Sequence, residues 1–298
     1  MPARVTQGMM NTQLLRNLNA NMIRNEKLMN QLATGRVINK PSDDPVGITF
    51  ALRYRNELAD TSQYRENVDS LLSQLEYTDT VLNQVTNVLK RVYELAVGGA
   101  NGTNPPDAMN AYKEEVDELK EQLINLGNSK FNGLYIFNGE KTDVQPYDPA
   151  TLLTQGTDTK VAQYMVSPGV LIPGNVTGNE VFGDPGEQDQ LFRIMEELST
   201  ALGNSDHETV SNLLGKLDSR LSKVLAVQAE VGARMNRAEL VEGRLVDLDL
   251  NLQSMQSKIE DADLAEVIIK LKMGESVYQS SLAVGARLIT PTLIDFLK

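Results

Sequence analysis

Two long stretches of this sequence repeat apolar residues every three or four positions and contain no proline: 46–104 and 186–290. Spacings of three and four place the repeated residues on one face of an α-helix. A helix with one apolar stripe is unstable alone in water, so such helices must pack on one another. The pattern therefore predicts a mainly α fold, a long antiparallel helical bundle or coiled coil.

The stripes consist almost entirely of aliphatic side chains. The chain has six phenylalanines, nine tyrosines and no tryptophan, which suits closely packed long helices. The repeated positions are Val68, Leu72, Leu75, Leu82, Val85, Leu89, Val92 and Ala96 in the first stretch, and Val210, Leu214, Leu217, Leu221, Val224, Val231, Met235 and Ala238 in the second.

Turn-forming residues concentrate between the two stretches. Five of the eleven prolines fall within 141–189, which predicts an insert of strands and loops that closes the far end of the helical arms. A short strand is predicted at 134–137, between two Asn-Gly pairs. At 41–45, Pro-Ser-Asp-Asp-Pro predicts a turn in which Asp44 caps the next helix.

Both chain ends carry stripes of their own, and they are predicted to pair with each other. A two-helix hairpin has a single seam, yet its other faces would still carry Leu14, Leu28, Val267, Ile269, Val277 and Leu288. Exposed apolar surface of this kind marks assembly; the alternative is a self-contained terminal core. The predicted assembly residues are Leu15, Leu18, Met22, Met29, Leu32, Ile268, Leu271, Tyr278, Leu282, Ile289 and Phe296.

The residues that carry common enzyme chemistry are scarce. Cysteine is absent, which excludes disulfides and thiolate metal sites, and the single histidine, His207, is predicted to be solvated in a polar turn. Asp43-Asp44 and Asp261-x-Asp263 lack a third ligand nearby, so helix caps and turns are favoured over a metal site. We expect no catalytic residue, cofactor, metal or small-molecule substrate.

The net charge of −12 is unevenly distributed along the chain. Residues 1–40 carry six basic residues and one acidic residue, whereas 41–263 carry 18 basic and 36 acidic residues. An acidic middle argues against nucleic-acid binding. Prolines interrupt the uncharged segment 161–179, so no membrane span is expected, and no cleavable signal peptide is recognised. Composition alone would indicate a cytoplasmic protein.

Several motifs resemble the bacterial flagellin family. They are Arg-Val-Thr at 4–6, Leu-Ala-Thr-Gly-Arg-Val-Ile at 32–38, Pro-Ser-Asp-Asp-Pro at 41–45, Glu-Leu-Ala-Val at 94–97, Ala-Asn-Gly-Thr at 100–103, Glu-Glu-Val-Asp at 114–117, Phe-Asn-Gly at 131–133 and Leu-Ile-Asp-Phe-Leu at 293–297. Within the family, residues 133–142 and Tyr-Gln-Ser-Ser-Leu-Ala at 278–283 look more like the hook–filament junction type (FlgL type) than flagellin.

The resemblance implies an axial structural protein with nested domains. Residues 1–40 with 261–298 would form the inner tube domain, and 41–140 with 190–260 a helical bundle domain with a short β-hairpin. Residues 141–189 would be the outer insert.

It also implies export through the flagellar type III channel to the extracellular flagellum, which overrides the cytoplasmic expectation. The implied partners are further copies of the chain, the neighbouring hook-associated protein (FlgK type), flagellin and an export chaperone (FlgN type). The alternatives are a flagellin proper and a cytoplasmic coiled-coil adaptor.

Overall fold

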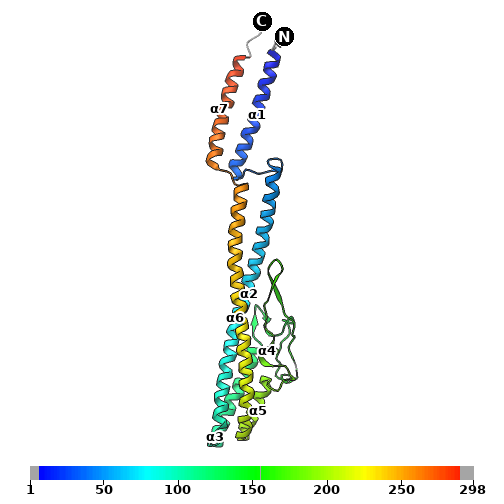
Figure 1. Ribbon diagram of the computed structural model, residues 1–298, viewed down its shortest axis with the longest axis vertical. Helices are drawn as coiled ribbons and strands as arrows, with labels where there is room; N and C mark the ends of the chain where they lie inside the picture. Colours follow the sequence, from blue (N-terminus) through cyan, green and yellow to red (C-terminus); the bar gives the residue numbers. More distant parts are fainter. Residues whose placement is uncertain (1–6, 155, 289–298) are drawn as a thin grey trace. The chain divides into compact units, whose positions relative to one another are not determined.

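The computed structural model describes residues 7–154 and 156–288, and in these the prediction of a mainly α fold is confirmed (Figure 1). In chain order the elements are α1 (Gln7–Thr34), α2 (Pro45–Ala100), α3 (Pro106–Gly127), β1 (Lys130–Phe131), β2 (Leu134–Tyr135), β3 (Gln163–Ser167), β4 (Val170–Pro173), α4 (Gly178–Phe182), α5 (Leu191–Gly203), α6 (His207–Glu260) and α7 (Leu264–Leu288). None of the helices in these ranges is long and apolar enough to cross a membrane.

The chain divides into two compact units, which are described separately. One consists of residues 1–60 and 248–298, and the other of residues 61–247. The long helices α2 and α6 each contribute to both units. The interruptions predicted between the end segments and the arms correspond to helix ends, because α1 stops at Thr34 and α6 stops at Glu260.

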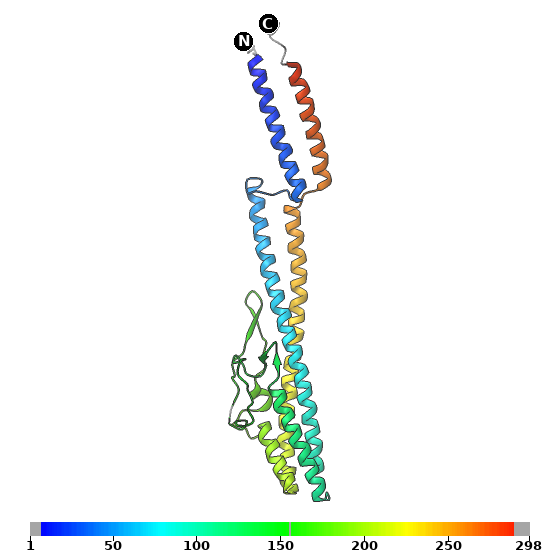
Figure 2. The same ribbon diagram turned by 180° about the vertical axis from the view of Figure 1, so that it is seen from behind.

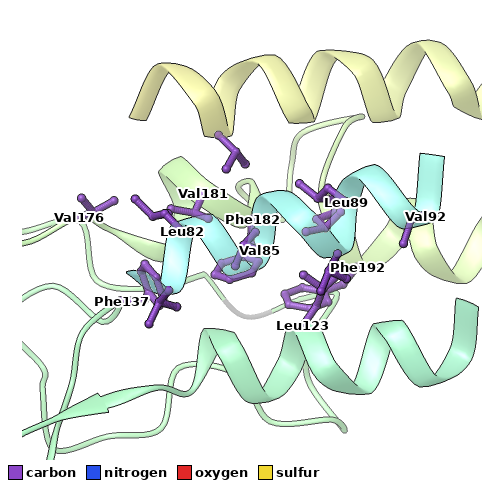
Figure 3. Packing of buried hydrophobic residues seen from close by; sticks show 14 of the residues in the cluster. Leu82, Val85, Leu89, Val92, Leu123, Phe137, Val176, Val181, Phe182 and Phe192 are labelled. Atoms are coloured by element: carbon purple, nitrogen blue, oxygen red, sulfur yellow. The ribbon is translucent and has the colours of Figure 1, made fainter. Parts of the chain in front are cut away.

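The core of unit 61–247 contains the predicted arm stripes. Leu75, Leu82 and Val85 of α2 are fully buried, and Val224 and Val231 of α6 belong to the same core. Figure 3 shows Leu82, Val85, Leu89 and Val92 of α2 in the core between α3 and α6. Fully burying an aliphatic side chain of this size contributes about 1.5–3 kcal/mol relative to leaving it exposed. Packing of these stripes therefore holds the arms together.

One end of this unit is closed by helices rather than by the insert. α3 packs on α5, with Met109, Val116 and Leu123 of α3 buried at seven-residue intervals. His207 is half-buried here, and its Nδ1 lies 2.7 Å from the carbonyl oxygen of Gly99, so the prediction of a solvated histidine is wrong. The ring belongs to the junction between α2 and α6, which lie far apart in the sequence.

The insert lies along the flank of the arms in both views (Figures 1 and 2), so its predicted place at their far end is wrong. Tyr164 donates a hydrogen bond from its hydroxyl to Gln74 Oε1 (2.8 Å), and Asn67 Nδ2 donates to the carbonyl oxygen of Met165 (2.8 Å). The reason is apolar burial: Val166 and Ile172 of the insert are fully buried in the core of the arms.

Two antiparallel hairpins accompany the helices. β1 pairs with β2, which confirms the predicted short hairpin, and β3 pairs with β4. The strand predicted at 134–137 is shorter than expected, because β2 ends at Tyr135. Phe137 is instead fully buried and packs edge-on against Phe182, with ring centroids 5.5 Å apart. The ring of Phe137 therefore lies in the core of the unit and not in the hairpin (Figure 3).

The loop between α4 and α5 is held by a buried arginine. Arg220 of α6 is 1% exposed and donates to the carboxylates of Glu187 and Asp189 and to the Asp189 carbonyl oxygen. Burial alone would raise the pKa of Asp189. Hydrogen bonds from Lys223 and Ser219, with the charges of Arg220 and Lys223, outweigh it and lower that pKa to about 2. A depressed folded-state pKa means that this contribution to stability is complete above about pH 4 and is lost only as the pH falls towards 2.

Candidate assembly surface

Helices α1 and α7 lie side by side and antiparallel in unit 1–60 and 248–298 (Figures 1 and 2), so the predicted pairing of the chain ends is confirmed. Their buried core is small. Leu28, Val267 and Leu271 form it, and Leu32 and Ala262 pack against it. Three buried side chains are a small apolar core for two helices of 28 and 25 residues.

Two glycines of α7 let the helices approach closely. A Cβ atom at Gly274 would collide with the side chain of Asn25, and one at Gly285 would lie 2.7 Å from Leu14 Cδ2. Asn25 Oδ1 is buried at this contact and has no hydrogen-bond partner among the described residues. The seam therefore continues past the apolar core through small and polar positions.

The structure separates the predicted assembly residues into two groups. Leu271 is buried in the seam, and Leu18, Leu32 and Tyr278 are half-buried along it. The others within the described ranges point into solvent: Leu15, Met22, Met29, Ile268 and Leu282. Ile289 and Phe296 lie outside the described residues.

The seam itself differs from the predicted stripe. The sequence predicts Leu28 and Val267 on other faces, but both belong to the buried core, and Leu14 faces Gly285. The reason is that Asn25 and Gly274 occupy seam positions. A polar residue or a glycine interrupts an apolar repeat, yet both can occupy the seam where two helices pack closely.

Two faces of exposed apolar residues flank the seam, one on each side, while Ile23 and Ile269 are exposed on the side away from it. Residues 14, 21 and 28 of α1 and 267, 274 and 281 of α7 follow the seam at seven-residue intervals. In an antiparallel pair, residues one position after the seam residues of both helices lie on the same side. Face 1 is defined by Leu15, Met22 and Met29 of α1 with Ile268 and Leu282 of α7.

Face 2 lies on the opposite side. Its residues come one position before the seam residues 25, 271, 274, 278 and 285. It is defined by Arg24 of α1 with Lys270, Met273, Val277 and Val284 of α7. A groove of about 340 Å³ runs along this face between the helices. Its lining comprises Asn21, Arg24, Asn25, Leu28, Lys270, Met273, Gly274 and Val277. Met22 on face 1 is 53% exposed and Met273 on face 2 is 63% exposed, so both faces offer uncovered apolar surface.

The two linkers that lead into the hairpin are tied together. Val37 donates its backbone N–H to the Glu260 carbonyl oxygen (2.7 Å), and Ala262 donates to the Gly35 carbonyl oxygen (2.8 Å). The Glu260 carboxylate is buried and accepts a hydrogen bond from Arg55 Nη2 at 2.7 Å. These contacts fix the segments 35–37 and 260–262 next to each other.

The aspartates near the linkers act as caps, as predicted. Asp44 Oδ1 accepts from the backbone N–H groups of Val46 and Gly47 at the start of α2, both at 3.0 Å. Asp263 Oδ1 does the same at the start of α7. Within residues 7–154 and 156–288, no three histidine, aspartate or glutamate side chains come close enough to hold a metal ion.

Comparison with protein families accounts for these helices. Residues 5–142 match the bacterial flagellin N-terminal helical region, and residues 214–297 match the bacterial flagellin C-terminal helical region. The chain belongs to the bacterial flagellin family. The two matched regions contain α1 with α2 and α7 with most of α6, so they include both exposed faces. As a member of this family, the chain is a structural protein of the bacterial flagellum.

Individual relatives come from both branches of the family. Flagellar hook-associated protein 3 of Salmonella typhimurium is 28% identical over 277 residues, which cover 86% of this chain and 87% of the relative. A flagellin of Halalkalibacterium halodurans is 24% identical, with 91% of this chain and 90% of the relative covered.

Solved structures share the fold. A putative flagellar hook-associated protein from Vibrio parahaemolyticus superposes with a TM-score of 0.68 at 22% identity, over 74% of this chain and all of that chain. Bacillus cereus FlgL superposes with a TM-score of 0.60 at 21% identity, over 69% of this chain and 99% of that chain.

Proposed function

We propose that this protein joins the hook-associated zone of the flagellum to the flagellin filament, and that its terminal hairpin drives its assembly. The observation that carries the proposal is the apolar surface left uncovered on both sides of the α1–α7 seam. Exposed apolar surface of this extent is a property of assembly subunits. Similarity to hook-associated protein 3 over almost the whole chain supports the place in the flagellum.

The proposed domain roles follow from where the apolar surface is exposed. Residues 1–40 with 261–298 would form the inner tube domain, because the hairpin carries faces 1 and 2. Residues 41–140 with 190–260 would form the outer helical domain, which has its own core. Residues 141–189 would be its outermost part. The role is structural and requires no reaction, cofactor or small-molecule substrate.

The proposed partners are those of a junction subunit outside the cell. They are further copies of this chain, the neighbouring hook-associated protein (FlgK type) and flagellin. An export chaperone (FlgN type) would cover the C-terminal helix before secretion, because α7 exposes Ile268, Ile269, Met273 and Val277. Covering these residues in the cell would prevent premature association.

A filament subunit is the second candidate. The similarity to a flagellin over 91% of this chain supports it, because the terminal helical regions are common to both branches. A cytoplasmic adaptor has less support, because both matched regions of the chain are helical regions of the bacterial flagellin family.

Deletion of the gene separates junction protein from filament subunit. We expect hooks to remain in place and flagellin to be secreted without polymerising, because the surface on which it nucleates would be missing. In wild-type flagella, quantitative immunoblotting should find this chain as a minor component. Finding it as the dominant protein along the whole filament would assign it as flagellin instead.

A further inference from the structure

We propose that neighbouring copies associate head to tail through the hairpin, with face 1 of one copy packed on face 2 of the next. The inference rests on the proposed function, because it assumes that the hairpin is the assembling part. It adds which surface meets which, and therefore the symmetry of the assembly.

The apolar parts of the two faces have complementary character. Face 1 presents Met22 and Met29 seven residues apart, and both side chains are more than half exposed. Face 2 presents the groove of about 340 Å³ beside Gly274, with Met273 and Val277 along it. Methionine side chains are long and flexible and fill irregular grooves well. A row of methionines against a groove buries more apolar surface than two like faces would.

The isolated charges of α1 point to the same pairing. Glu26 is the only acidic residue in the first 40 positions, and its spacing from Met22 and Met29 places it at the edge of face 1. There it also lines a small pocket with Lys27 and Lys40. Arg24, two residues earlier, lines the groove on face 2. Neither side chain forms a hydrogen bond or ion pair within the described residues, and both are exposed.

Like faces would repel each other at these positions. Face 1 against face 1 places the same unpaired acidic residue, Glu26, on both sides of the contact, and face 2 against face 2 does the same with Arg24. Lys270 of face 2 is already paired with Glu266 at 2.8 Å. Face 1 against face 2 brings Glu26 towards Arg24. Charge complementarity of this kind sets which surfaces meet. Because the two faces differ, the contact repeats from copy to copy and generates a ring or tube instead of a closed dimer.

Cysteine cross-linking tests the pairing, and the chain has no cysteine of its own to interfere. In flagella isolated from cells that carry the Met22→Cys/Met273→Cys double variant, mild oxidation should give a ladder of disulfide-linked oligomers. Met22→Cys alone and Met273→Cys alone should remain monomeric, because neither position meets its own copy. Dimers from either single variant would show like faces in contact and overturn the proposal.

Incorporation of the variants must be measured in the same samples. If the double variant enters flagella at the wild-type level and gives no ladder, the pairing is wrong while the proposed function stands. If the wild-type chain itself is absent from flagella, the proposed function has failed.

Charge reversal gives a second measurement that needs no new thiol. Arg24→Glu and Glu26→Lys should each lose assembly when expressed alone, because every contact then joins like charges. Co-expressed, they should both be incorporated, because alternating copies pair opposite charges at every contact. Co-expressed wild-type chain should restore the incorporation of Arg24→Glu less well than Glu26→Lys does. If wild-type chain restores it equally well, like faces are in contact and the proposal is overturned.

Discussion

At the scale of single residues, Arg220 shows how one buried charge ties a loop to a long helix. Its guanidinium binds two carboxylates and a backbone carbonyl oxygen of segment 187–189, and Gly183 lies close enough that a Cβ would meet Arg220 Nη2 at 2.7 Å. Gly183 also has a φ of 96°, which disfavours any larger residue there. The arginine and the glycine therefore depend on each other.

Replacing Arg220 by methionine should destabilise unit 61–247 by about 3 kcal/mol. The variant leaves Asp189, whose side chain is 13% exposed, with only Lys223 and Ser219 as partners. Breaking a buried pair costs about 3–5 kcal/mol, and the remaining partners keep the loss at the lower end. Urea unfolding at pH 7, followed by circular dichroism, measures the change. Lys223→Met is the matched control: its ammonium binds the same carboxylates but is 46% exposed, so a loss below about 1 kcal/mol is expected. Equal losses in both variants would contradict this account.

At the scale of elements, the long helices could be predicted from the sequence and their exact faces could not. The stripe from Val68 to Ala96 is buried as predicted, because a long aliphatic repeat interrupted only at Asp79 has one stable orientation on a core. In α1 and α7 the apolar repeat predicts a stripe next to the observed seam. There the seam depends on Asn25 and Gly274, whose contribution is close approach and not hydrophobicity.

The position of the insert also lay beyond the sequence pattern. Its buried residues are separated by loops, so no periodicity links Phe137, Val166 or Ile172 to the stripe of α2. Cap positions were predictable for the opposite reason. Asp44 accepts hydrogen bonds from amides only two and three residues away. Such a contact depends on local sequence alone and can be predicted from it.

Two substitutions in α7 should separate folding of the hairpin from assembly. Leu271→Asp places a charge in a three-residue buried core, which costs several kcal/mol, so the amides of α1 and α7 should exchange at least about tenfold faster. Leu282→Asp changes a face 1 residue that is 46% exposed, so exchange in the monomer should stay near the wild-type rate while incorporation into flagella is lost. Hydrogen exchange by mass spectrometry and immunoblots of isolated flagella measure the two effects. Normal incorporation of Leu282→Asp would remove face 1 from the assembly.

At the scale of the whole molecule, the two units differ in how their apolar residues are used. Unit 61–247 has a continuous core to which α2, α3, α5, α6 and the insert all contribute. The terminal hairpin buries three large apolar residues and exposes many more. One unit therefore has its own stability, and the other depends on what covers it.

Limited proteolysis of dilute monomer should leave a resistant fragment close to residues 61–247. α1 and α7 should be cleaved first, because local opening costs least where few apolar contacts are lost. Mass spectrometry of the fragments gives the boundaries. In isolated flagella the same sites should be protected, since neighbouring copies would cover them. Equal resistance of α1, α7 and unit 61–247 in the monomer would contradict the assignment of the hairpin as the assembling part.

The paired linkers have a mechanical consequence. A pull on the terminal hairpin reaches α2 and α6 through two chain segments at once, at 35–44 and 261–263, so each segment bears part of the tension. The hydrogen bonds between Val37 and Glu260 and between Ala262 and Gly35 run across the direction of the chain. Tension along the chain loads them in shear, and they must break together for one segment to slide past the other. A rotating appendage is under continual mechanical load. The two backbone hydrogen bonds between the linkers distribute that load over both ends of the polypeptide.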